Sequence, residues 1–408
     1  MRTMTMVNRS RQQVLKPIHP FPARMAPDLV LEWLRAIGDN RRVLDPMAGS
    51  GVVLRQAIEL GHEAVGFDLD PLAVLMARVW TTPVTEENLD GWAARVVSEA
   101  RGTSESDVQL DWMDDDEETR SFTEYWFAAS QRADLRRIAF VLNRIGQGDC
   151  GEDKASLDAI RLALSRIIVT KEPRASLARD TSHSRPHRVL TDSDFQVFTA
   201  FEQSIRFLRR RLTGHPPSGA AHVAWGDARR LEALDDGMID AVITSPPYLN
   251  AIDYLRGHRL ALVWLGHGLR ELRHIRSSSI GAERAPDDRT AAAMFSRIRQ
   301  AMGNLEQLPN RYRLMIARYA EDIHLMISEI ARVLRPGGTA TLVVGNSCLR
   351  GTFIRNAAGV AEAARMVGLT PTGVRERVLP DNRRYLPVTE KGQLGRRMRT
   401  ETVCSFVR

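Results

Sequence analysis

A strand, glycine turn, helix and strand pattern near the N-terminus constrains the fold more than any other feature. Arg42–Asp45 is a short apolar strand that ends on an acidic residue. Val52–Leu60 has its apolar residues at helical spacing, and Gly61 follows as a helix-terminating residue. A second apolar strand, Ala64–Phe67, ends on Asp68. This β-turn-α-β unit predicts the start of a doubly wound α/β sheet, in which ligands bind at the carboxyl ends of the strands.

The strand pattern is interrupted after this unit and resumes later in the chain. Residues 85–219 show amphipathic helical patterns, an acidic run and a basic polar segment. Short apolar runs then predict further strands: Ala221–Trp225, Ile239–Thr244, Thr339–Val344 and Glu401–Val407. We therefore predict a domain formed by residues 1–84 and 220–408, with a mostly helical subdomain inserted at residues 85–219.

The charge balance favours a polyanionic partner. Lys and Arg total 57 against 50 Asp and Glu, which gives a net charge of +7 and a pI near 9.7. Cys150, Cys348 and Cys404 form no CxxC pair, so we expect neither a disulfide framework nor a metal site. The N-terminus has no secretory pattern and no apolar run could span a bilayer, so we expect a cytoplasmic protein without a membrane partner.

The turn between the first strand and the first helix is suited to holding a ligand. Gly49 and Gly51 let the backbone approach a ligand closely, and the following helix offers free N–H groups. The turn does not read GxGxxG, so a dinucleotide is not expected. Asp68, at the end of the second strand, is placed to accept hydrogen bonds from both hydroxyls of a ribose. Asp70 is the better candidate to cap the next helix, which Pro71 would start.

The segment Thr244-Ser245-Pro246-Pro247-Tyr248 follows another buried strand and contains the second group of candidate functional residues. Two consecutive prolines hold the chain extended and leave their carbonyls as fixed acceptors. With the hydroxyl of Ser245, these acceptors could take both hydrogens of an amino group and direct its lone pair toward an incoming methyl group. Tyr248 offers a flat face on which a base can stack.

At these residues the chain resembles the amino-methylating DNA methyltransferases of the class I fold, which use S-adenosylmethionine. Asp45–Gly51 resembles their cofactor loop, with Met47 where Phe is usual, and Thr244–Tyr248 resembles their catalytic loop. The resemblance implies a seven-stranded, mostly parallel Rossmann-like sheet. It also implies catalytic roles for Ser245, Pro246, Pro247 and Tyr248. A serine at position 245 is associated with methylation of cytosine N4, while adenine N6 stays an alternative.

Weaker parts of the resemblance extend the cofactor site and the base site. His19–Arg24 is similar to the family's N-terminal cofactor motif, and Gly226–Arg229 to the segment near the adenine ring. Asn382–Pro387 is similar to a late loop near the target base, which brings in Arg384. The cofactor residues implied by the resemblance are Phe21, Pro22, Arg24, Asp45, Met47, Gly49, Gly51, Asp68, Leu69, Asp227 and Ala228.

The inserted subdomain has a composition suited to target recognition. In the family, an insert at this place commonly carries that role. Its basic segment is dense in donors and cations that can contact phosphates and base edges, although a solvated polar loop would have the same composition. Arg256 and His258, after the catalytic loop, could hold phosphates near a flipped nucleotide or lie on a solvated helix face. Pro186 argues against a helix that would pair two nearby histidines as metal ligands. The nucleic-acid-binding candidates are Arg174, Arg179, Ser182, His183, Arg185, His187, Arg188, Arg256 and Arg384.

Three other functions stay open from the sequence. The chain could methylate RNA, for example guanine N2 in tRNA, although that group usually has Asp where Ser245 stands. It could also bind nucleic acid without turnover, or methylate a small molecule or a protein. No cysteine lies in a Pro-Cys loop, so methylation of cytosine at carbon 5 is not expected. The resemblance implies DNA as the partner, with RNA as the alternative, and leaves open a restriction or defence-system partner. Trp225 and Trp264 are expected in the core.

Overall fold

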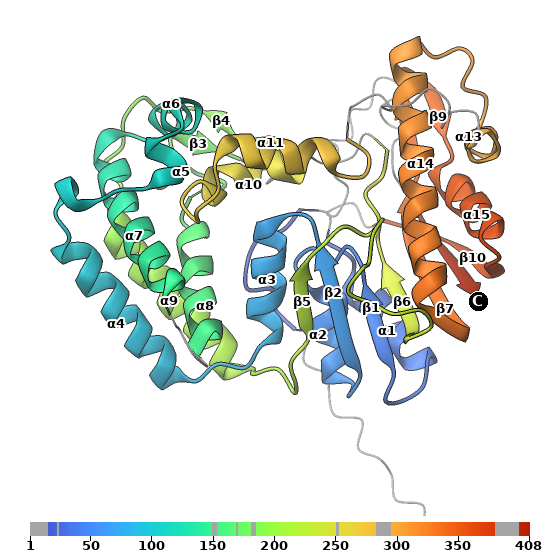
Figure 1. Ribbon diagram of the computed structural model, residues 1–408, viewed down its shortest axis with the longest axis horizontal. Helices are drawn as coiled ribbons and strands as arrows, with labels where there is room; N and C mark the ends of the chain where they lie inside the picture. The colour runs from blue at the N-terminus through green and yellow to red at the C-terminus, as the bar shows by residue number, and fades with distance from the viewer. Residues whose placement is uncertain are drawn as a thin grey trace, which may run out of the picture.

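The computed structural model describes residues 15–22, 24–148, 153–168, 170–180, 185–249, 253–282, 295–379 and 400–408. Its centre is a seven-stranded sheet in the order β10-β11-β7-β6-β1-β2-β5 (Figure 1). The strands are β1 (Arg42–Asp45), β2 (Glu63–Asp68), β5 (His222–Trp225), β6 (Ile239–Thr244), β7 (Leu334–Gly345), β10 (Thr370–Val378) and β11 (Thr400–Val407). Neighbouring strands from β5 to β7 are parallel, and β11 runs antiparallel to β7 and β10. The predicted seven-stranded, mostly parallel sheet is therefore confirmed.

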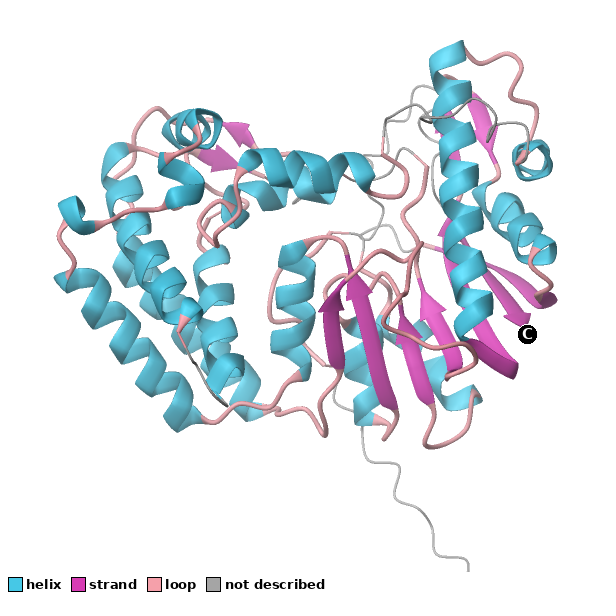
Figure 2. Cartoon of the chain, in the orientation of Figure 1, coloured by secondary structure: helices cyan, strands magenta, loops and turns pink. Residues whose placement is uncertain are grey.

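Two hydrophobic cores lie on opposite faces of the sheet because successive strand residues point to opposite sides. Val43 belongs to the core formed with α1 (Pro27–Ala36), α2 (Val52–Glu59) and α3 (Pro71–Thr81). Leu44, the next residue of β1, belongs to the core formed with α14 (Asn310–Val333) and α15 (Asn356–Met366). Helices thus cover both faces, as Figure 2 shows.

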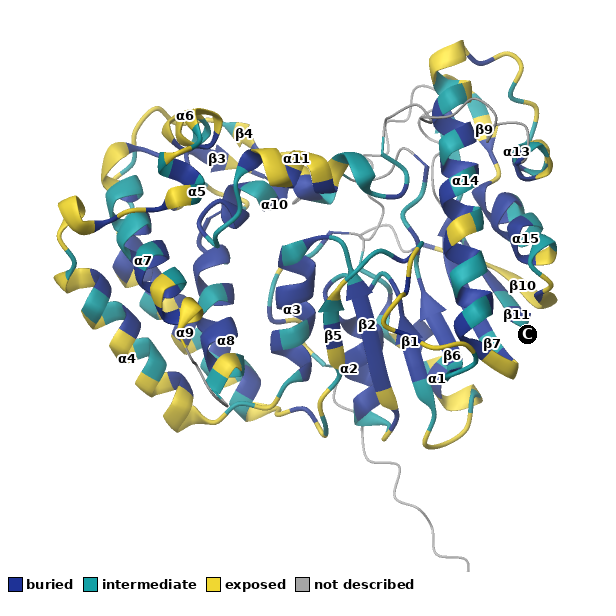
Figure 3. Cartoon of the chain, in the orientation of Figure 1, coloured by how far each residue is buried: buried dark blue, intermediate teal, exposed yellow. Residues whose placement is uncertain are grey.

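Residues 86–214 form a bundle of helices beside α3. The long ones are α4 (Glu86–Gly102), α7 (Ala129–Gln147), α8 (Lys154–Ser165) and α9 (Val197–Gly214). Shorter elements lie at one end: η1 (Glu105–Asp107), α5 (Asp111–Asp114), α6 (Glu117–Trp126), β3 (Ala178–Arg179) and β4 (His187–Arg188). The bundle shares one continuous core with α1, α2 and α3, while the outer side of α4 is exposed (Figure 3). Because the core is shared, the division at residues 84 and 219 stays a proposal about organisation.

The chain after β6 crosses above the carboxyl ends of the strands. Here α10 (Tyr254–Leu262) and α11 (Leu269–Ser278) extend from the bundle toward α14 (Figure 1). The remaining elements are α13 (Ser296–Met302), β8 (Ser347–Leu349) and β9 (Thr352–Ile354). The edge strand β10 was not predicted, because most of its residues are exposed and it lacks the apolar run of a buried strand. In the part of the chain that the structure describes, no helix is long and apolar enough to cross a membrane.

Candidate active site

The turn after β1 is held in a conformation that requires glycine. Gly49 has φ of 51° and Gly51 has φ of 83°, both in the left-handed region. A Cβ on Gly51 would lie 2.9 Å from the Cα of Ala77 in α3, so this position also lacks room for a side chain. The turn therefore packs against α3 and leads directly into α2.

The carboxylate of Asp68 joins this turn to the end of β2. The N–H of Gly49 donates to Oδ2 of Asp68 at 2.8 Å, and the N–H of Asp70 donates to Oδ1 at 2.9 Å. Burial, with the nearby charge of Asp70, raises the pKa of Asp68 to about 6, against the effect of these donors. Asp70 caps α3 by accepting a hydrogen bond from the N–H of Leu72 at 2.9 Å, as predicted.

Asp45, at the end of β1, contacts the beginning of the loop after β6. The Oγ1 of Thr244 donates to Oδ1 of Asp45 at 2.7 Å, and the N–H of Met47 donates to the same oxygen at 3.2 Å. Burial raises the pKa of Asp45 to about 7, although both hydrogen bonds lower it. The predicted cofactor loop and the predicted catalytic loop are therefore joined by a buried hydrogen bond.

The loop after β6 presents acceptors in fixed positions. The Oγ of Ser245 donates its hydrogen to the carbonyl oxygen of Val343 at 2.9 Å, so its lone pairs stay available to accept. The hydroxyl of Tyr319 donates to the carbonyl oxygen of Pro247 at 3.1 Å. The hydroxyl of Tyr248 donates to Oε1 of Glu401 at 3.3 Å. Burial, reinforced by the Glu401 carboxylate, holds the pKa of Tyr248 well above its ordinary value, so Tyr248 stays neutral.

The N-terminal motif lies against the cofactor loop. A Cβ on Gly49 would lie 3.1 Å from the ring of Phe21, so this ring occupies the space beside the glycine. Phe21 also stacks on Tyr254, with ring centroids 5.2 Å apart and an interplanar angle of 15°. Pro22 is buried and Arg24 is partly buried. The structure thus brings the predicted N-terminal motif to the predicted cofactor loop.

In the segment after β5, Arg229 makes ion pairs with two carboxylates. Its guanidinium donates to Asp227 at 3.0 and 2.6 Å and to Asp322 of α14 at 2.5 Å. Ala228 is buried, and the carbonyl oxygen of Leu69 accepts from the indole N–H of Trp225 at 2.9 Å. Asp227 can therefore contact a ligand only while it shares its oxygens with Arg229.

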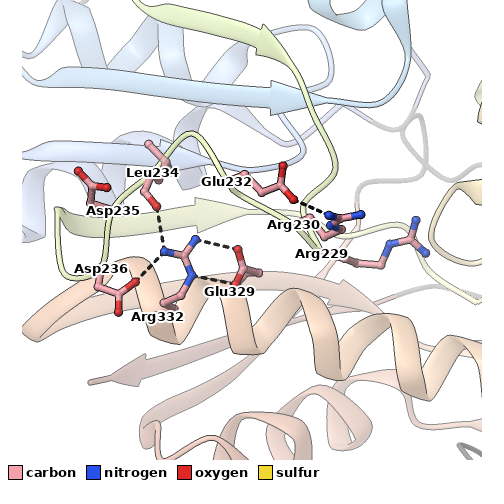
Figure 4. Close-up of a pocket in the computed structure, with 8 residues that line it drawn as sticks. All are labelled: Arg229, Arg230, Glu232, Leu234, Asp235, Asp236, Glu329 and Arg332. Carbon is pink, nitrogen blue, oxygen red and sulfur yellow. Dashed lines mark hydrogen bonds and ion pairs between the residues drawn. The ribbon is translucent and has the colours of Figure 1, made fainter.

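A surface hollow of about 600 Å³ lies between this segment and α14 (Figure 4). Its centre is Arg332, whose guanidinium bonds with Asp236, Glu329 and the carbonyl oxygen of Leu234, each at 2.8 Å. Asp236 precedes β6, whereas Thr244 ends it, so the hollow lies toward the opposite end of the strand from the catalytic loop. These paired charges join α14 to the chain between β5 and β6.

Aromatic residues of α6 contact arginines of two elements that carry nucleic-acid-binding candidates, β4 and α10. The guanidinium of Arg188 on β4 lies 4.8 Å from the ring centre of Tyr125, and that of Arg259 on α10 lies 5.1 Å from the ring centre of Phe122. Tyr125 itself is 52% exposed. Among the candidates, Arg174, Arg179, Arg185, His187 and Arg256 are exposed, while Ser182, His183 and Arg384 lie outside the described residues.

Two expectations from the sequence were wrong. His258 neither faces phosphate nor lies on a solvated helix face, the two interpretations left open: it is buried, and its Nδ1 lies 2.5 Å from Oδ2 of Asp70. Tyr254 and His258 are four residues apart and therefore lie on the same face of α10, where both contact Phe21. This spacing in the sequence is the signal that could have indicated a buried His258. Trp225 is 58% exposed because β5 is an edge strand, whereas Trp264 is in the core as expected.

The strand order of the sheet is that of the class I methyltransferase fold. The chain is 20% identical over 383 residues to the Type II methyltransferase M.MvaI of Kocuria varians. The aligned region covers 84% of this chain and 79% of that protein. It is 23% identical over 281 residues to M.BsoBI of Geobacillus stearothermophilus, an alignment that covers 64% of this chain and 53% of that protein. It is 34% identical over 74 residues to M.MjaII of Methanocaldococcus jannaschii, an alignment that covers 17% of this chain and 14% of that protein. These relatives confirm the predicted resemblance to DNA methyltransferases.

No family model matches the chain. Solved structures overlap it weakly. A methyltransferase from Mesorhizobium loti, described as S-adenosylmethionine-dependent, is 10% identical over 94% of this chain and 100% of that chain, with a TM-score of 0.31. The fold assignment therefore rests on the strand order of this chain.

Proposed function

We propose that this chain is an S-adenosylmethionine-dependent DNA methyltransferase that acts on the exocyclic amino group of a flipped base, cytosine N4. The observation that carries the proposal is the hydrogen bond between Thr244 and Asp45. It places the acceptor-rich loop beside the glycine turn, at the carboxyl ends of neighbouring parallel strands. This edge is where ligands bind in sheets of this kind.

The glycine turn and its carboxylates fit the proposed cofactor. Gly49 and Gly51 give the turn its left-handed backbone and its close packing against Phe21 and Ala77, and Asp68 is a buried acceptor suited to ribose hydroxyls. Buried carboxyls at positions 45 and 68 also suit the cationic ammonium and sulfonium groups of the cofactor. S-adenosylmethionine supplies an electrophilic methyl group when bound. Phe21, whose ring lies beside Gly49, and Leu69, next to Asp68, would flank the cofactor, and Asp227 and Ala228 would lie toward its adenine.

The loop after β6 orients the target nitrogen. Because the hydrogen of Ser245 Oγ is committed to Val343, this oxygen accepts from the amino group rather than donating to it. The carbonyl of Pro246 accepts the second hydrogen. Both bonds direct the nitrogen lone pair toward the methyl group, so catalysis rests on positioning. Tyr248 stacks on the base, which must leave the duplex to reach the loop.

Methyl transfer without a nucleophilic residue of the enzyme agrees with the burial and the raised pKa of Cys404. Cys404 is buried within β11, and burial raises its pKa to about 11, so it holds little thiolate at neutral pH. Cys348 lies on β8, and Cys150 is outside the described residues. This supports methylation of an amino group over attack at a ring carbon. Ser245, rather than Asp, favours cytosine over adenine.

The exposed basic side chains of β3, β4 and α10 support a nucleic-acid substrate. Arg179 and His187 lie on the short hairpin, and Arg256 lies near the start of α10, just after the catalytic loop. Exposed Tyr125 under Arg188 adds an aromatic surface to the same face. Cations of this kind hold phosphates and position a duplex. The relatives named as Type II methyltransferases support DNA as the substrate.

The test is incubation with deuterium-labelled S-adenosylmethionine and mixed-sequence duplex DNA or total RNA, followed by nucleoside mass spectrometry. We expect label in N4-methyldeoxycytidine, lost in Ser245→Ala. Label in N6-methyldeoxyadenosine would correct the base, and label in RNA alone would correct the substrate. Absence of label from every nucleoside would contradict the proposed activity.

A further inference from the structure

The helix that follows the catalytic loop is fastened to the cofactor site by a buried histidine. His258 of α10 is 7% exposed, and its Nδ1 lies 2.5 Å from Oδ2 of Asp70. The other oxygen of Asp70 caps α3 through the N–H of Leu72. A single carboxylate therefore joins the start of α3 to α10, which lies 188 residues further along the chain.

The same pair is one hydrogen bond away from the carboxylate proposed to hold the ribose. The N–H of Asp70 donates to Oδ1 of Asp68 at 2.9 Å, while Oδ2 of Asp68 accepts from Gly49. Any shift of Asp70 would move the donor that orients Asp68. The position of His258 thus affects the ribose site through Asp70.

A second contact of α10 ends on the same loop. Tyr254, one turn before His258, stacks on Phe21, and the rings of Phe21 and His258 are 5.8 Å apart. Phe21 in turn occupies the space beside Gly49. Both contacts of α10 therefore converge on the cofactor loop.

The charged groups around His258 are carboxylates. Asp70 on α3, Asp68 on β2 and Asp180 after β3 act on it. Burial disfavours the charged imidazole, but these carboxylates outweigh burial and raise the pKa of His258. The imidazolium in turn offsets part of the repulsion between Asp68 and Asp70.

We propose that His258 is a positioning residue for the cofactor, which holds Asp70, and through it Asp68, in the geometry that receives the ribose. The role rests on the proposed function of the site. It couples α10, and with it the end of the catalytic loop, to occupation of the cofactor pocket. His258 itself touches neither the cofactor nor the base.

The test is calorimetric titration of the full chain with S-adenosylhomocysteine, without nucleic acid, between pH 7 and pH 9, above the pKa of about 6 of Asp68. Affinity should be highest at low pH and fall as the pH rises through the raised pKa of His258, because the charged form is the one paired with Asp70. His258→Gln should bind on the order of tenfold more weakly at the low end, the usual loss of one hydrogen bond to a charged group. The pH dependence should be flattened in the variant.

Two further variants separate positioning from folding. Asp70→Asn keeps a good helix cap but removes the charge, so it should show the same weakened, flattened binding even if His258→Gln folds poorly. His267→Gln removes a matched histidine whose Nδ1 lies 3.0 Å from Glu271 at the surface, and it should bind as the wild type does.

Wild-type affinity and an unchanged pH profile in both His258→Gln and Asp70→Asn would overturn the inference. A wild-type chain that does not bind S-adenosylhomocysteine would overturn both the inference and the proposed function. Binding that follows this pattern, without methyl transfer to any nucleic acid, would overturn the proposed function and support the positioning role.

Discussion

Thr244 donates a 2.7 Å hydrogen bond to Asp45, a residue 199 positions earlier in the chain, and so joins the ends of two adjacent parallel strands. Both side chains are buried, at 0% and 3% exposure. The bond places the cofactor loop after β1 beside the catalytic loop after β6. The relative position of the two loops therefore depends on a buried polar contact as well as on the sheet.

Thr244→Val should weaken folding, because it keeps the shape of the side chain but leaves Oδ1 of Asp45 with only the N–H of Met47 as a donor. We expect the free energy of unfolding to fall by about 1–3 kcal/mol, the usual result of leaving a buried polar group unsatisfied. Urea denaturation at pH 8 measures this. Thr81→Val is the matched control, because the buried Thr81 hydroxyl bonds the carbonyl of Ala77 within its own helix. An equal loss in both variants would contradict the prediction.

The buried carboxyl of Asp45 should make stability fall as the pH rises. Its pKa is raised from 3.8 to about 7 in the folded protein, so between these values the folded state binds more protons than the unfolded state. Raising the pH therefore favours unfolding through this group. Between pH 5 and pH 8 the wild type should lose up to about 2 kcal/mol relative to Asp45→Asn in urea denaturation. Parallel pH profiles of the two proteins would rule out a protonated Asp45 at pH 5.

Asp68→Asn should weaken cofactor binding, because the amide removes the charge that ribose hydroxyls would meet. Hydrogen bonds to charged groups contribute about 1.5–3 kcal/mol each, so the Kd for S-adenosylmethionine should rise at least about tenfold. Isothermal titration calorimetry measures this. Glu63→Gln, at the exposed start of the same strand, is the control and should bind normally. Unchanged affinity in Asp68→Asn would show that the ribose lies elsewhere.

Tyr248→Ala should lower turnover and leave cofactor affinity almost intact. Stacking of a base on an aromatic ring contributes about 1–3 kcal/mol, which corresponds to roughly 5- to 150-fold in rate. Tyr248→Phe keeps the ring and removes the hydroxyl that bonds Glu401 at 3.3 Å and contacts Ser245, so it should retain most of the activity. Single-turnover methylation of duplex DNA measures both. Full activity in Tyr248→Ala would remove the stacking role.

Arg256→Ala should weaken DNA binding in a salt-dependent way. Each phosphate contact contributes about 0.9 to the slope of log affinity against log salt, so the slope should become shallower by about that amount. Arg375→Ala is the control, since Arg375 lies on the edge strand β10 and pairs with Glu32. Fluorescence anisotropy from 50 to 200 mM salt provides the measurement. An unchanged slope would place Arg256 outside the phosphate contacts.

The sequence by itself determined the elements whose residues act through local chemistry. Apolar periodicity indicated β1, α2, β2 and β6, and glycines at left-handed positions indicated the turn at Gly49 and Gly51. The capping bond of Asp70 ends two residues from its own position, so its capping role was also visible. The segment from Thr244 to Tyr248 stood out because consecutive prolines and a serine have few structural alternatives.

Only the tertiary structure decided how distant residues pair. Burial of His258 against Asp70 and the orientation of the Ser245 hydroxyl toward Val343 depend on strands and helices far apart in the chain. The exposure of Trp225 and the existence of β10 depend on which strands became sheet edges, and a local pattern of apolar residues does not specify that. Hydrogen bonds and burial are properties of the folded neighbourhood, so these groups acquired their partners, and His258 its raised pKa, only when the chain closed around them.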